Sequence, residues 1–106
     1  MSSVNFTQIH DDAYKAAQQV QAVPQNGYVE TAIMAITALK MLKKDGAVVS
    51  NEDERTNTSS AKFLIAQAMD KKGPGHSYDS EVNAFLNAYN TAVNRALGIS
   101  PGRDDR

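Results

Sequence analysis

Residues 28–44 carry apolar side chains on nearly every side of a helix and include neither proline nor glycine. One set recurs at i, i+3, i+4, i+7 and i+10, the spacing of a single helical face, and comprises Val29, Ala32, Ile33, Ile36 and Leu39. A second set lies on the opposite side and comprises Met34, Ala38, Met41 and Leu42. A helix that is apolar nearly all round is normally buried on more than one side. We therefore predict that a helix over about residues 28–45 is central, lying between neighbouring helices or between subunits.

The ends and the small residues of this central helix add detail. Asn26 or Gly27 can cap its start, and Gly46 can close its end. Small residues that would let another backbone come close lie on one side, at Thr31, Ala35 and Ala38. Lysines crowd the last turns, at Lys40, Lys43 and Lys44. Cations at that end suit the helix dipole, which is the preferred interpretation; a phosphate or acidic-partner site is the alternative.

A first helix is predicted from residue 6 to about residue 22. Asn5 can act as its N-cap, with Gln8 completing a capping box. Its apolar stripe is Phe6, Ile9, Ala13, Ala16 or Ala17, and Val20. Pro24 disfavours helical geometry at the residue before it, so the helix should end near Ala22. The connector to the central helix is short, and short connections place helices side by side and antiparallel. We therefore predict that the first two helices form a hairpin.

The third segment allows two descriptions. Ser50 precedes an acidic run with Asp53 three residues on, which is typical of a helix N-terminus. Residues 56–60, however, are all poor helix formers. Either a long helix covers about residues 51–72, or a polar loop reaches residue 59 and the helix is short; we favour the long helix. Its second half repeats apolar residues at helical spacing, at Ala61, Leu64, Ile65, Ala68 and Met69.

A fourth helix has the cleanest amphipathic pattern. Its stripe is Val82, Phe85, Leu86, Tyr89, Val93, Ala96 and Leu97. Asp79 or Ser80 can cap its start after the turn-rich connector 73–80, and Gly98 can end it. The pattern predicts an all-α fold, a small four-helix bundle with the second helix central. We expect residues 1–106 to form a single helical domain, ordered over about residues 5–98, with residues 99–106 as a mobile tail.

Composition narrows the functional classes. The formal net charge is −1 and the sequence pI is about 6.0, which argues against a nucleic-acid binder because that needs a basic excess. Cysteine is absent, so there is no disulfide framework and no thiolate metal site. The first residues contain no apolar run long enough for a signal peptide or a membrane span. We expect a cytoplasmic protein.

A row of asparagines is the least expected feature of the fourth helix. Asn83, Asn87, Asn90 and Asn94 stand at i, i+4, i+7 and i+11 and so share one face. Each costs roughly half a kcal/mol of helix propensity relative to alanine. The simpler interpretation is a solvated face. The functional one is a row of amides that hydrogen-bonds across an interface or to a polar ligand, with Tyr89 and Tyr78 as flanking contact residues.

Catalytic and metal motifs are not evident. His76 lies in a loop with Tyr78 and Asp79 and could form an acid/base pair, but a solvated loop histidine is the simpler interpretation. His10, Asp11 and Asp12 are adjacent in sequence and so point in different directions on a helix. The chain has no P-loop, GxGxxG, GxSxG or EF-hand pattern and no helical histidine pair. We therefore expect no enzyme activity, no cofactor and no metal site.

The preferred function is that of a small non-catalytic interaction protein: an adaptor, inhibitor or sequestering module. It would act by protein binding, as a homo-oligomer. One alternative is a binder of a small anionic ligand or nucleotide, held between helices or subunits by the lysines and tyrosines. A further alternative is a DNA-binding regulator, which the single basic residue of the fourth helix, Arg95, disfavours.

Overall fold

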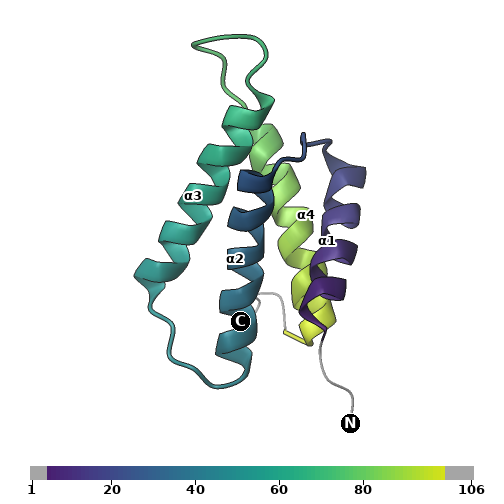
Figure 1. Cartoon of the computed structure of the whole chain (residues 1–106), viewed down its shortest axis with the longest axis vertical. Helices are drawn as coiled ribbons and strands as arrows, with labels where there is room; N and C mark the ends of the chain where they lie inside the picture. The colour runs from purple at the N-terminus through teal and green to yellow at the C-terminus, as the bar shows by residue number, and fades with distance from the viewer. Residues whose placement is uncertain (1–4, 100–106) are drawn as a thin grey trace.

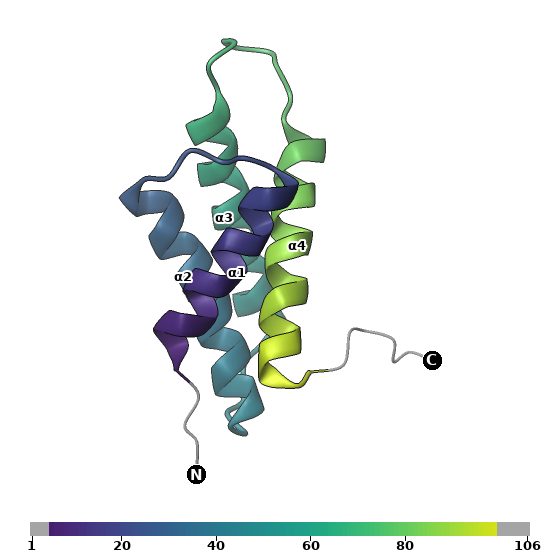
Figure 2. The ribbon, with the colours of Figure 1, turned by 90° about the vertical axis from the view of Figure 1, so that its right-hand side faces the viewer.

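The computed structural model describes residues 5–99, which form four helices and no strand (Figure 1). The helices are α1 (Phe6–Val20), α2 (Gly27–Lys44), α3 (Asn51–Met69) and α4 (Asp79–Leu97). They run alternately up and down the long axis, so each is antiparallel to the next (Figures 1 and 2). The described residues thus confirm the predicted all-α four-helix bundle. The predicted tail from residue 100 onwards lies outside them.

The helices are arranged as two closely packed pairs. α1 packs chiefly on α4, and α2 packs chiefly on α3. Both α2 and α4 contact all three other helices, whereas α1 and α3 do not touch within residues 5–99. α2 is therefore central, as predicted, and shares that position with α4.

The predicted hairpin of the first two helices is only loosely formed. α1 and α2 are antiparallel, but their contact is sparse because the apolar stripe of α1 is taken up by that of α4. The connector carries the chain from one helix pair to the other. Val23 is buried within it, and both its backbone groups are bonded to the Gln18 side chain, at 2.8 Å for the N–H and 2.7 Å for the carbonyl. The short connection makes α2 antiparallel to α1, as predicted, but the main packing partner of α2 is α3.

Local signals account for most helix ends. Side-chain oxygens of Asn5, Asn26 and Ser50 accept backbone N–H bonds at 2.8–3.0 Å, which satisfies donors that a helix start leaves free. Gly98 ends α4 in the left-handed region, with φ 72°. The predicted cap of α4 by Asp79 or Ser80 is wrong, because the helix starts at Asp79 after Tyr78, which offers no capping oxygen.

α3 is the long helix that was favoured, although residues 51–60 contribute nothing to the core. Its fully buried residues are Ala61 and Ile65 in the second half. Ser50 as cap and three acidic residues in the first turn support its start. Just after α4, Ile99 is half-buried and packs against the core.

A chain of polar side chains crosses the apolar core and joins three helices. His10 of α1 is only 2% exposed. Its Nδ1 lies 2.9 Å from the Tyr89 hydroxyl of α4, and its Nε2 lies 2.7 Å from a carboxylate oxygen of Glu30 on α2. The Tyr89 hydroxyl also bonds the Thr37 hydroxyl of α2 at 2.5 Å. We call these four residues the core polar network.

One set of donors satisfies the core polar network. A carboxylate only accepts, so the His10 Nε2–H donates to Glu30. With a neutral imidazole, His10 Nδ1 then accepts from the Tyr89 O–H, and the Thr37 O–H donates to the Tyr89 oxygen. The second Glu30 oxygen accepts from the Gln25 amide at 3.0 Å. Because buried polar groups are costly only when unpaired, this network can specify how the helices pack without a large loss of stability.

Two buried tyrosines provide a matched test of the network. The Tyr14 hydroxyl is buried and has no hydrogen-bond partner within residues 5–99, whereas the Tyr89 hydroxyl bonds both His10 and Thr37. We expect Tyr89→Phe to lower the free energy of unfolding by about 1–3 kcal/mol, because it leaves His10 and Thr37 without their partner. Tyr14→Phe should leave stability unchanged or slightly higher. Urea unfolding followed by circular dichroism measures both, and equal losses would contradict the network's role.

The same tyrosines predict alkaline sensitivity. Burial, as the main cause, raises the pKa of Tyr14 and of Tyr89 to about 12, from an ordinary value of 10.0, and the Glu30 charge adds to both. The folded state therefore holds these protons more tightly than the unfolded state. Their contribution is complete below pH 10 and is lost as the pH rises towards 12. Unfolding free energies across this window should fall steeply for the native chain and less steeply for Tyr14→Phe; parallel curves would contradict this.

Candidate functional site

The asparagine row of α4 does not form one open surface. Asn83 and Asn87 are exposed, whereas Asn90 and Asn94 are half-buried. The side-chain oxygens of Asn90 and Asn94 are fully buried and have no hydrogen-bond partner within residues 5–99. Asn83 and Asn87 are thus solvated, as in the simpler interpretation. Asn90 and Asn94 each carry a buried acceptor that makes no hydrogen bond within the described residues.

The two tyrosines predicted as flanking contact residues are not at the surface. Tyr89 is 0% exposed and belongs to the core polar network, and Tyr78 is 8% exposed. Their position on the apolar stripe and at the start of α4 explains the burial. Both predictions of a surface contact are therefore corrected. The tyrosine that is exposed is Tyr28, at 78%.

His10 is the residue that sequence reasoning missed. Its helical spacing to Ala13, Tyr14 and Ala17, at +3, +4 and +7, was the available signal, and all four are buried. Its pairing with Glu30 looks like an acid/base arrangement, but both ring nitrogens are occupied inside the core. The predicted loop histidine, His76, stacks edge-on against Tyr78 with ring centres 4.6 Å apart. Both ring nitrogens of His10 are thus engaged within the core, whereas His76 is exposed in its loop.

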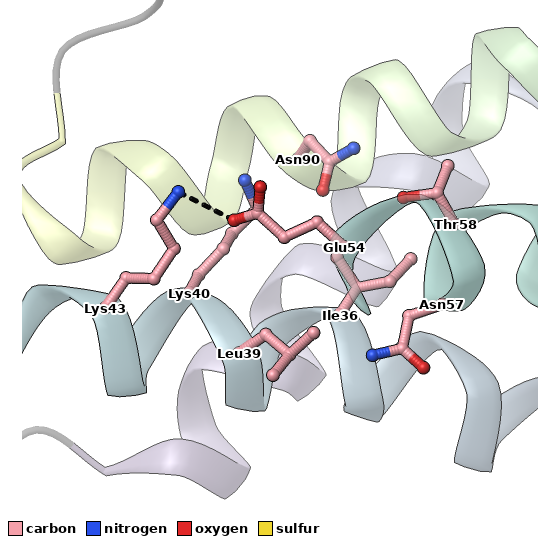
Figure 3. Close-up of a pocket in the computed structure, with 8 residues that line it drawn as sticks. All are labelled: Ile36, Leu39, Lys40, Lys43, Glu54, Asn57, Thr58 and Asn90. Carbon is pink, nitrogen blue, oxygen red and sulfur yellow. Dashed lines mark hydrogen bonds and ion pairs between the residues drawn. The ribbon is translucent and has the colours of Figure 1, made fainter. Parts of the chain in front are cut away.

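A pocket of about 280 Å³ lies where α2 and α3 diverge below α4 (Figure 3). We call it the lysine pocket. Its lining comes from three helices: Ile36, Leu39, Lys40 and Lys43 from α2, Glu54, Asn57 and Thr58 from α3, and Asn90 from α4. The Lys43 ammonium is paired with the Glu54 carboxylate at 2.7 Å. Figure 3 shows the Asn90 amide projecting from α4 towards the other two helices.

Lys40 differs from its neighbour Lys43. It is half-buried, and no carboxylate oxygen lies within 4.0 Å of it in residues 5–99. Burial is the main cause that lowers the pKa of Lys40, with a smaller contribution from the Lys43 charge, while Glu54 opposes the shift. Two lysines and one glutamate leave the lysine pocket with one formal positive charge, in a chain whose net charge is −1.

A second feature is the side of α2 that faces away from the core. At 3.6 residues per turn, six residues share it: Tyr28, Thr31, Met34, Ala35, Ala38 and Leu42. We call it the outer face of α2. Tyr28 and Leu42 are exposed, and the half-buried Met34, Ala35 and Ala38 do not pack against the core. No residue of the outer face is charged. Of the second apolar side predicted for this helix, Met34, Ala38 and Leu42 lie on the outer face, whereas Met41 packs against the core.

Among residues 5–99, none of the four helices combines the length and apolar character needed to cross a bilayer. In the same residues, no three histidine or acidic side chains come together as a metal ligand set. Comparison of the chain with protein-family models, with curated proteins and with solved structures gave no match.

Proposed function

We propose that this protein is a small non-catalytic interaction module that acts by protein binding and self-associates through the outer face of α2. The uncharged, partly exposed outer face is the observation that supports this proposal most directly. A solvent-facing side of a surface helix normally carries charged or polar residues. All four charges of α2 lie instead on the other half of the helix, at Glu30, Lys40, Lys43 and Lys44.

The spacing of the outer face favours a second copy of this chain as its partner. Tyr28, Ala35 and Leu42 are seven residues apart, with Thr31 and Ala38 between them. This is the a/d pattern along which helices pair. Small residues occupy the middle, where two backbones could come close, and large residues occupy the ends.

The same spacing makes the face complementary to itself. In an antiparallel pair with its twofold axis at Ala35, Tyr28 of one copy would meet Leu42 of the other, at both ends. Such an interface uses one patch on both subunits, as closed dimers do. Apolar contact without charge also avoids the like-charge repulsion that symmetry would otherwise create. Asn83 and Asn87, exposed on α4, remain proposed polar contacts for a different protein.

Self-association is tested by charging the centre of the face. Ala35→Glu would place two carboxylates together across the twofold axis, so we expect the dimer to dissociate at least tenfold more readily. The matched control is Ala16→Glu, the same change at an exposed position of α1. Light scattering coupled to size-exclusion chromatography gives the masses. A native chain that stays monomeric at the highest concentration reached, or equal effects of both variants, would rule out this interface.

A paired substitution tests the antiparallel arrangement. Tyr28→Glu alone and Leu42→Lys alone should each weaken the dimer, because each puts a charge against an apolar side chain. Combined in one chain, they should restore it, since each introduced carboxylate then meets an introduced ammonium. In a parallel dimer the combination would instead place like charges together and weaken association further. The same mass measurement separates the two arrangements.

A further inference from the structure

The lysine pocket combines an apolar base with polar groups that lack partners. Ile36 and Leu39 supply the apolar side, and polar side chains from α3 and α4 complete the lining. Six of the eight lining residues are polar or charged, so the pocket favours a polar ligand over an apolar one. At about 280 Å³ the pocket is at the small end of ligand sites. The pocket is therefore large enough for a small molecule but too small for a nucleotide or a segment of another protein.

Lys40 is the group in the pocket that would bind an anion. The ammonium of Lys43 already has the Glu54 carboxylate at 2.7 Å, whereas Lys40 has no ion pair within residues 5–99. Lys40 is also half-buried, and a partly desolvated charge gains more from an opposite charge than a solvated one does. An incoming carboxylate or phosphate would supply the charge that Lys40 lacks.

Asn90 supplies a second, independent contact. Its side-chain oxygen is buried and has no hydrogen-bond partner within residues 5–99. A buried acceptor left unpaired costs roughly 1–3 kcal/mol. If the amide turns its oxygen towards the pocket, a ligand hydroxyl that donates to it would recover that loss. Asn90 is therefore the asparagine of the α4 row that would contact a ligand in this pocket, whereas the exposed Asn83 and Asn87 lie outside its lining.

We propose that the lysine pocket binds a small hydroxylated anion, a hydroxycarboxylate or a sugar phosphate. Its acidic group pairs with Lys40, and its hydroxyl donates to the Asn90 oxygen. A ligand with both groups would bridge Lys40 of α2 and Asn90 of α4 and should bind more tightly than an anion without a hydroxyl. The site is independent of self-association through α2, so either can fail alone.

Two probes test this site, malate as a hydroxycarboxylate and glycerol 3-phosphate as a sugar-phosphate analogue. Calorimetric titration should show binding of at least one, and the side-chain amide signal of Asn90 should shift in NMR spectra. Lys40→Met should weaken binding at least tenfold. Lys15→Met, at an exposed lysine of α1, should leave it unchanged. Asn90→Ala should weaken the hydroxylated probes but not inorganic phosphate or succinate, which lack the alcohol.

The outcomes separate the proposal from simpler explanations. Equal weakening by Lys40→Met and Lys15→Met would mean a general charge effect and would overturn it. Binding of phosphate and glycerol 3-phosphate with equal affinity would remove the role of Asn90. Absence of heat and of shifts with both probes would also overturn it. A variant that failed to fold is recognised by its lost helical circular dichroism, and Lys40→Gln then replaces Lys40→Met as the neutral variant.

Discussion

The hydrogen bond between His10 and Tyr89 joins α1 to α4 across the apolar core, at a point where both side chains are buried. Alanine-rich stripes give helices little shape to interlock, and hydrophobic contact has no preferred direction. A buried imidazole bonded on both sides tolerates only a narrow range of distances and angles. We infer that the core polar network sets the register of α1, α2 and α4. Glu30 and Thr37 lie two helical turns apart on α2, so the network fixes that helix at two points.

Fixing α2 matters because its different sides have different uses. Val29 and Ile33 enter the core, Leu39 and Lys40 line the lysine pocket, and Ala35 and Ala38 belong to the outer face. Ile33 and Lys40 are seven residues apart and so lie on the same side of α2. A rotation of α2 by one residue, about 100°, would expose Ile33 and turn Lys40 away from the lysine pocket. The composition of this helix, apolar nearly all round, thus corresponds to a buried core side and an uncharged outer face.

Sequence periodicity predicted what each helix buries, but not which helix it meets. The four helices, the long α3 and the caps at Asn5, Asn26 and Ser50 follow from local signals that act within a few residues. The pairing of α1 with α4 depends on contacts between residues far apart in the chain, which no local pattern encodes. His10 and Tyr89 were misjudged for a related reason. From sequence alone a polar side chain is expected in solvent. His10 is instead buried because its hydrogen-bond partner, Tyr89, comes from 79 residues further along the chain.

The same limit applied to the asparagine row, which splits where α3 comes alongside α4. Asn90 gains its significance from α3, whose first half contributes no buried residue and contacts α2 through the Lys43–Glu54 pair. A partly exposed pair of this kind contributes about 0–1 kcal/mol. The first half of α3, which forms one wall of the lysine pocket, is therefore held in place by few buried contacts. Regions with few buried contacts open at low free-energy cost, so a ligand bridging Lys40 and Asn90 would stabilise the helix that closes over it.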